Sequence, residues 1–74
     1  MTMQTVTIII EREGDSYVSL CPEYDIASQG DTVSEARANL KEALELFLET
    51  ASSEEILRRY RGEVYVGPLE VAIA

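Results

Sequence analysis

The sequence has no histidine, and it holds a single cysteine, Cys21. Without histidine, no Ser-His or Cys-His nucleophilic pair can form and no imidazole base is available. A lone cysteine cannot form an intramolecular disulfide, and the chain has no recognisable zinc-binding set. Gly-rich phosphate loops and Cys-x-x-Cys motifs are missing too. These absences exclude the commonest catalytic arrangements, so we expect no enzymatic activity and no cofactor.

Positive charge is also scarce, with six Lys and Arg against 14 Asp and Glu and a net charge of −8. Nucleic-acid binding depends on Lys and Arg that neutralise phosphates, so no direct nucleic-acid role is expected. A basic protein is the more suitable partner. The N-terminus lacks the basic region of a signal peptide, and no apolar stretch approaches the 18 residues of a membrane span. We therefore expect a cytoplasmic protein with no membrane partner.

A length of 74 residues predicts a single domain over residues 1–74. A chain of this size buries only about 60% of the surface that its unfolded form exposes. Small domains often recover the missing burial by pairing with a copy of themselves or with another protein. We therefore expect a homodimer or a higher homo-oligomer.

The first half of the chain has the pattern of short strands. Apolar and polar residues alternate from Thr5 to Arg12, with many β-branched side chains, as in a half-buried strand. A turn at residues 13–15 leads to a second strand, Ser16 to Cys21, which Pro22 ends because it lacks a backbone N–H. A third short strand is predicted over Ile26 to Gln29.

Two helices are predicted to follow. Thr32 with Glu35 three residues later forms a capping box, and Ser52 with Glu55 could cap a second, short helix that Gly62 ends. The first helix has an apolar stripe that should pack on the sheet. The stripe consists of Val33, Ala36, Leu40, Ala43, Leu44, Phe47 and Ala51.

Glu63 to Ala74 is predicted to close the chain as a strand in two pieces, because Gly67-Pro68 marks a bulge, a bend or an edge. The predicted order is strand, strand, strand, helix, short helix, strand. This is an α+β fold with a small, mainly antiparallel sheet of three or four strands and one long helix on one face. For self-association we expect the last strand to serve, through Val64, Tyr65, Val66, Leu69, Val71 and Ile73.

The opposite face of the long helix is acidic. We name Glu35, Glu42, Glu45 and Glu49 the glutamate ridge, and Leu46 lies near its edge. Like charges three or four residues apart destabilise an isolated helix slightly. The ridge is therefore open to two interpretations, a solvated face and a surface for a basic partner. On the second one, Glu23 and Asp25 in the adjoining loop are further candidate contacts.

Two chemical alternatives compete with plain structural roles. A two-metal nuclease could use Asp15, Glu23, Asp25 and Asp31, although Asp residues beside glycine are also ordinary turn residues. Cys21 has no basic neighbour in sequence to lower its pKa, which favours a buried small hydrophobe over a reactive thiol.

The run "DSYVSLCPEYDIASQGDTVSEARANLKEALELFLE", Asp15 to Glu49, resembles the antitoxin core of the HicB family. A strand ends in Cys-Pro-Glu, and Ser-Gln-Gly-Asp-Thr leads into a helix of the pattern "EAxxNLKEAxELxLE". The matching helix positions are Glu35, Ala36, Asn39, Leu40, Lys41, Glu42, Ala43, Glu45, Leu46, Leu48 and Glu49.

The resemblance implies a partial ribonuclease H-like fold without the catalytic carboxylates. It also implies an antitoxin of a type II toxin–antitoxin system, which binds a small basic messenger-RNA-cleaving toxin of the HicA family and covers its active-site histidine. Many family members continue into a DNA-binding segment. This sequence ends at Ala74 without one, so DNA binding is not expected. A solitary self-associating scaffold and a degenerate metal-dependent nuclease remain the alternatives.

Overall fold

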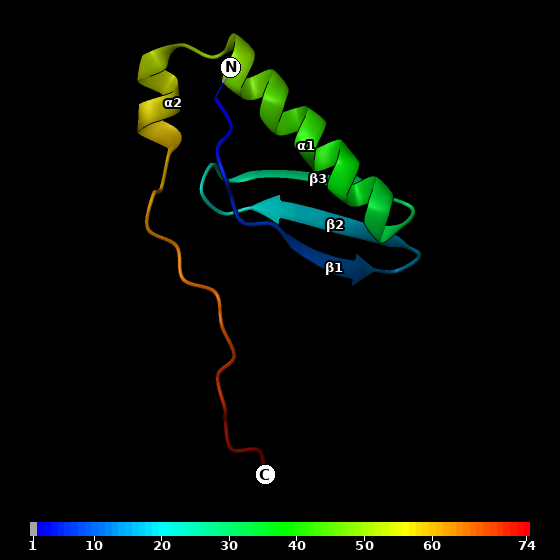
Figure 1. Cartoon of the computed structure of the whole chain (residues 1–74). Helices are drawn as coiled ribbons and strands as arrows, with labels where there is room; N and C mark the ends of the chain where they lie inside the picture. The colour runs from blue at the N-terminus through cyan, green and yellow to red at the C-terminus, as the bar shows by residue number, and fades with distance from the viewer. Residues whose placement is uncertain (1) are drawn as a thin grey trace.

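The computed structural model describes residues 2–74 and shows a two-layer α+β arrangement (Figure 1). The sheet has the order β1-β2-β3, with both pairs antiparallel. The long helix lies across one face of the sheet, as the sequence predicts. The elements are β1 (Ile9–Glu13), β2 (Ser16–Cys21), β3 (Ile26–Gly30), α1 (Val33–Thr50) and α2 (Ser53–Arg59).

The predicted hairpin is present, but β1 begins at Ile9 rather than Thr5. Its turn uses Gly14 at φ +61°, a conformation that glycine adopts without a side-chain clash. The shortening of β1 has a physical cause. Opposite residues 5–7 the partner strand β2 has already ended, and the Thr7 N–H donates instead to the Glu23 carboxylate, at 3.0 and 2.9 Å.

Helix α1 begins where the capping box predicts. The Thr32 hydroxyl accepts a hydrogen bond from the Glu35 N–H at 3.0 Å. The Glu35 carboxylate reaches back to the Asp31 N–H, at 2.9 Å, one residue before the donor that a standard box would use. Ala36, Leu40 and Leu44 of the predicted stripe are buried, whereas Val33 in the first turn is half exposed.

The core lies between α1 and the sheet, where Cys21, Tyr24, Leu40 and Leu44 are buried. The Ser19 hydroxyl donates to the Ala36 carbonyl at 2.8 Å, which satisfies a polar group inside this layer. Partly buried apolar side chains from the N-terminal segment, β3, α1 and α2 pack against the core. They are Val6, Ile8, Ile26, Phe47, Leu48 and Ile56.

Gly30 allows α1 to approach β3 closely. A Cβ atom at this position would lie 2.5 Å from the Ala36 nitrogen, closer than atoms can pack. The Asn39 amide donates to the Gln29 carbonyl at 2.7 Å and ties the next turn of the helix to the same strand. Gly30 and Asn39 therefore fix the position of α1 over the sheet.

The short helix α2 is also present, with Ser52 as its N-cap. It ends at Arg59, before the predicted stop at Gly62. The Arg59 Nε donates to the Tyr24 carbonyl at 2.8 Å, and the Tyr60 ring packs on the Tyr24 ring with centroids 5.2 Å apart. These contacts anchor the end of α2 to the loop between β2 and β3.

The predicted closing strand over Glu63–Ala74 is wrong for the single chain. No residue after Arg59 belongs to a helix or strand, and the segment runs away from the domain (Figure 1). The radius of gyration is 14.4 Å, whereas a compact chain of this length would have about 11 Å. A strand needs a neighbour for its backbone groups, and this chain brings no sheet edge to the segment.

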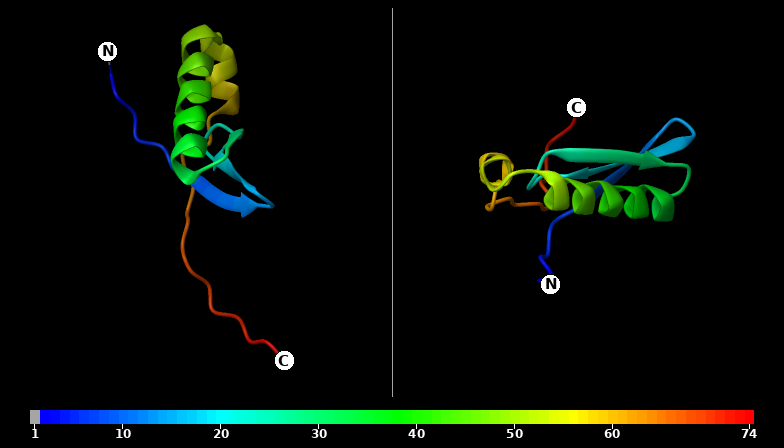
Figure 2. Two further views of the ribbon diagram at one scale, coloured as in Figure 1. Left: turned by 90° about the vertical axis from the view of Figure 1, so that its right-hand side faces the viewer. Right: turned by 90° about the horizontal axis from the view of Figure 1, so that it is seen from above.

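The second face of the sheet carries no helix among the described residues (Figure 2). Because Ser19 points to α1 and side chains alternate along a strand, Val18 and Leu20 point to the other side. Ile9 is paired with Leu20 and shares that side. We name this surface the open face, and its three apolar side chains are only half buried.

No helix among residues 2–74 has the length and apolar character needed to cross a bilayer.

Candidate functional site

The glutamate ridge is a real surface feature of α1. All four of its side chains are exposed. Glu45 forms an ion pair with Lys41 at 3.3 Å, and Glu35 is held by the Asp31 N–H. Within residues 2–74, Glu42 and Glu49 form no ion pair. The ridge therefore presents two carboxylates that no side-chain cation of the described chain neutralises.

Along the helix axis Leu46 lies between those two carboxylates, at the edge of the ridge. It follows Glu42 by four residues and precedes Glu49 by three, so all three share one side of the helix. Its side chain is 60% exposed. An apolar centre bordered by charge is the arrangement found in protein interfaces, where a dry core is surrounded by a polar rim.

A groove of about 650 Å³ borders the ridge. It lies between the N-terminal segment, residues 2–8, and α1, and Val6, Tyr24, Leu44 and Leu48 supply its apolar lining. Lys41 and Glu45 stand at its rim, so the groove and the ridge form one continuous surface. The Tyr24 hydroxyl donates to Gln4 at 2.8 Å, which holds the N-terminal segment in place.

Glu23 differs from the ridge residues because its side chain is buried in the loop between β2 and β3. The Thr7 N–H and hydroxyl both donate to its carboxylate, and the Cys21 thiol lies 3.5 Å away. Burial alone would raise the pKa of Glu23, but the hydrogen bonds from Thr7 and from backbone N–H groups outweigh it and lower the pKa. Glu23, a candidate partner contact, therefore binds Thr7 within its own chain and holds the N-terminal segment against the domain.

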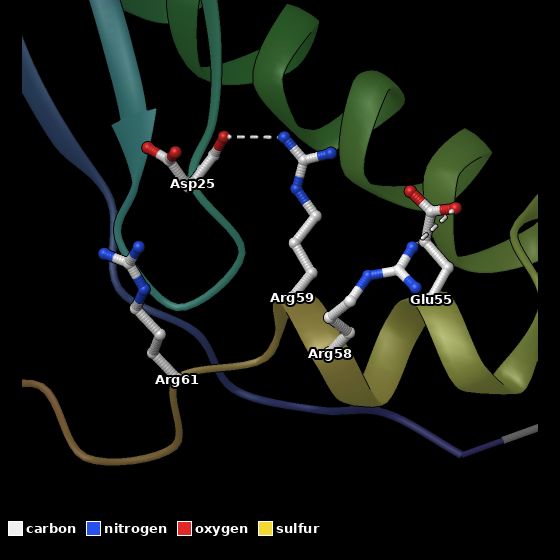
Figure 3. A pocket seen from close by; sticks show the side chains of 5 residues that line it. All are labelled: Asp25, Glu55, Arg58, Arg59 and Arg61. Atoms are coloured by element: carbon white, nitrogen blue, oxygen red, sulfur yellow. Dashed lines mark hydrogen bonds and ion pairs between the residues drawn. The ribbon is translucent and has the colours of Figure 1, made fainter.

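Asp25, the other loop candidate, is exposed and has φ 54°. It lines a pocket of about 260 Å³ with side chains of α2 (Figure 3). The Arg59 guanidinium donates to the Asp25 carbonyl at 3.3 Å, and Arg58 pairs with Glu55 at 3.6 Å. With Arg61, the pocket gathers three of the six basic residues of the chain. The sequence signal for this pocket is the Arg-Arg-Tyr-Arg run at residues 58–61.

The four carboxylates of the nuclease alternative do not meet. Tyr17 pairs with Gly30 at one end of the sheet, so Asp15 and Asp31 lie there. Glu23 and Asp25 belong to the loop at the opposite end. Residues 2–74 contain no cluster of three His, Cys, Asp or Glu side chains that could hold a metal ion. The antiparallel register therefore separates the four carboxylates that the nuclease alternative would need at one metal site.

Cys21 is fully buried, and burial raises the pKa of its thiol. A raised pKa keeps the sulfur protonated and weakly nucleophilic at neutral pH. The side chain therefore has the environment expected of a core residue.

The residues proposed for self-association all lie in the segment that leaves the domain. Tyr65, Val66, Leu69, Val71 and Ile73 are exposed, and Val64 is half buried. The segment therefore presents apolar side chains that the rest of the chain does not cover.

The molecule is thus a small two-layer α+β domain with an acidic helix and an uncovered apolar C-terminal segment. It is 30% identical to a UPF0150 protein of Helicobacter pylori over 70 residues, which cover 93% of this chain and 97% of that protein. It is also 42% identical to the UPF0150 protein ssl0738 of Synechocystis over 50 residues, 66% of this chain and 69% of that protein. The chain therefore belongs to the UPF0150 family.

The names of these relatives state no activity. No family model matches the chain, and no solved structure matches it.

Several residues of the sequence motif that resembles HicB antitoxins have structural roles in this fold. Gly30 allows α1 to approach the sheet, Thr32 caps the helix, Ala36 is buried on its inner face, and Asn39 binds it to β3. The fold alone explains these four positions of the shared pattern. The same pattern also includes Glu42, Glu45, Leu46 and Glu49, whose side chains are exposed on the ridge or near its edge.

Proposed function

We propose that this protein is an antitoxin-like, non-enzymatic binding module of a type II toxin–antitoxin system. It binds and neutralises a small basic messenger-RNA-cleaving toxin of the HicA class through the outer face of α1. The observation that carries the proposal is the exposed Leu46 between the unpaired carboxylates of Glu42 and Glu49. The resemblance of Asp15 to Glu49 to the HicB antitoxin core and the net charge of −8 support it.

Charge and apolar contact have separate roles in this proposal. The carboxylates attract a basic protein over distances of several ångströms and speed its association. Leu46 gives the complex a desolvated centre, where a few side chains carry most of the binding free energy. The groove beside Glu45 offers further apolar surface to the same partner.

The test is co-expression with a HicA-class toxin, followed by co-purification and measurement of the binding rate. Reversing both carboxylates, Glu42→Lys with Glu49→Lys, is expected to slow association at least tenfold and to abolish rescue of growth. Added salt is expected to weaken the wild-type complex as the Debye length falls from about 10 Å at 0.1 M towards 3 Å at 1 M.

The matched control makes the same change of charge elsewhere on the surface. Asp15→Lys with Glu54→Lys alters two exposed residues outside α1 and is expected to keep both binding and rescue. Equal effects of the two double variants would reject the ridge as the binding surface. Failure of the wild type to rescue growth or to retain any small basic protein would reject the proposed function in favour of a solitary self-associating scaffold.

A further inference from the structure

We name residues 63–74 the C-terminal arm. Among the described residues 2–74, no hydrogen bond joins the arm to the domain. The last anchor before it is Arg61, whose N–H donates to the Glu23 carbonyl at 2.7 Å. Beyond that point the arm points away from the sheet and α1, as Figure 1 and the left-hand view of Figure 2 show. At about 3.3 Å per residue an extended chain of this length reaches roughly 40 Å.

The arm has the side-chain pattern of a bulged strand. Val64 and Val66 alternate regularly, and Gly67-Pro68 then adds one residue before the next apolar position, Leu69. A β-bulge accommodates one such extra residue and returns the following side chains to the same face. Proline is tolerated at a bulge because no ladder hydrogen bond is needed from it. One face of the arm therefore consists of Val64, Val66, Leu69, Val71 and Ile73.

The domain offers a matching unpaired edge at β1. The sheet order leaves the outer side of Ile9–Glu13 without a neighbouring strand among the described residues. The other edge, β3, is the strand on which α1 chiefly packs. The open face with Ile9, Val18 and Leu20 adjoins β1 and is also uncovered. An exposed edge of this kind is a template for strand addition.

We propose that two copies of this chain exchange their C-terminal arms, each arm adding as a strand to the β1 edge of the other copy. The arm lacks a ladder partner in its own chain, and the β1 edge lacks one too. Reciprocal exchange satisfies both in a closed two-fold dimer. The pairing goes beyond toxin binding, because it uses the opposite end of the chain and leaves the glutamate ridge exposed.

Molar mass in solution is the first test, by light scattering on the eluting protein. The full chain is expected to have twice its 8.2 kDa mass, and Val66→Asp with Val71→Asp is expected to restore the monomer. The control places the same two charges on the other face of the arm, Ala72→Asp with Ala74→Asp, and should remain dimeric. Circular dichroism confirms folding of both variants, since these residues lie outside the core. A monomeric full chain, or equal behaviour of the two variants, would overturn the proposal.

Cross-linking between two different copies tests the exchange itself. In a Cys21→Ala background, one tagged copy carries Glu11→Cys on β1 and an untagged copy carries Ala72→Cys on the arm. A short bismaleimide is expected to join the two copies after mixing, and Val66→Asp with Val71→Asp on both should prevent it. If a chain with both cysteines cross-links only within itself, the arm folds back on its own β1 and exchange is excluded.

Added salt distinguishes this pairing from toxin binding. Each copy carries a net charge of −8, so two copies repel one another and screening favours their pairing. Binding to a basic partner responds in the opposite direction. A dimer that dissociates with salt would argue against the exchanged arm as the main contact, whereas a salt-stable dimer supports it.

Discussion

Glu23 joins parts of the chain that hydrophobic periodicity does not connect. Its carboxylate accepts two donors from Thr7, and its backbone carbonyl accepts the N–H of Arg61. One residue therefore holds both the N-terminal segment and the point from which the C-terminal arm departs. A buried carboxylate is costly without partners, and here hydrogen-bond donors stabilise its charged form.

Replacement of Glu23 by glutamine should lower the free energy of unfolding at neutral pH by about 1–3 kcal/mol, because buried donors lose a charged acceptor. The pKa of Glu23 is lowered in the folded state, so its stabilising effect is complete above its unfolded value, near 4.5, and is lost as the pH falls through the folded pKa. Urea unfolding of both proteins at neutral and acidic pH measures the difference.

The difference between wild type and the Glu23→Gln variant should therefore narrow in acid. Glu42→Gln is the control, because Glu42 is exposed and forms no ion pair with the described residues. It should change the free energy of unfolding by less than about 0.5 kcal/mol. If the free energies of unfolding of wild type and Glu23→Gln differed by the same amount at every pH, the charged form of Glu23 would not be the source of the stabilisation.

At the scale of elements, the position of α1 depends on close backbone approach. Gly30 lies directly beneath the first turn of the helix, and the Asn39 amide and the Ser19 hydroxyl bind across the same layer. The remaining helix contacts are apolar and could slide, whereas these three have fixed geometry. They define the register of α1 over the sheet, and with it the direction in which the ridge faces.

Gly30→Ala should destabilise the domain by about 1–3 kcal/mol, because the new methyl group would lie 2.5 Å from the Ala36 nitrogen and force α1 away from β3. Gly67→Ala is the matched control, since no atom lies within 4 Å of a Cβ there. Chemical unfolding monitored by helical circular dichroism compares them. Equal stability of the two variants would show that α1 can shift at no cost.

Local signals predicted most of the elements. The helix starts were predictable because Thr32 and Ser52 bind donors only three residues away. The second strand was predictable because alternation and Pro22 define its limits. The Thr7–Glu23 contact spans 16 residues of sequence and leaves no periodic signal, so nothing local could reveal it. The pocket lined by Arg58, Arg59 and Arg61 could not be predicted for a similar reason, because it forms only where α2 lies beside the loop that holds Asp25.

The glutamate ridge and the C-terminal arm show how far the candidate sites could be predicted from sequence. Helical periodicity correctly predicted that Glu42, Glu45 and Glu49 are exposed, since that depends on one element alone. The strand pattern of residues 63–74 was recognised, but strand formation depends on a neighbour that a pattern cannot supply. Periodicity specifies which side chains share a face, and it does not specify which molecule covers that face.

At the scale of the whole molecule, the described chain leaves a large apolar surface in water. Each fully buried aliphatic side chain would contribute about 1.5–3 kcal/mol, and several of the arm are almost fully exposed. A domain of this size has little other surface to bury. Association is therefore the natural way for it to gain stability.

If the arms are exchanged, stability depends on protein concentration. The melting temperature of the full chain should rise as its concentration increases over two orders of magnitude, because dimerisation stabilises the folded state by mass action. The Val66→Asp with Val71→Asp variant should melt at one temperature throughout. Differential scanning calorimetry gives both series, and a concentration-independent wild type would contradict a dimer held by the arms.

The buried Cys21 gives the domain a natural probe of its own opening. As the only thiol of the chain, and one with no exposed surface, it can react with a dissolved disulfide reagent only when α1 and the sheet separate. Its modification rate under native conditions therefore reports how often that layer opens. Comparing this rate in the presence and absence of a bound partner would show whether recognition on the outer side of α1 slows motion in the interior.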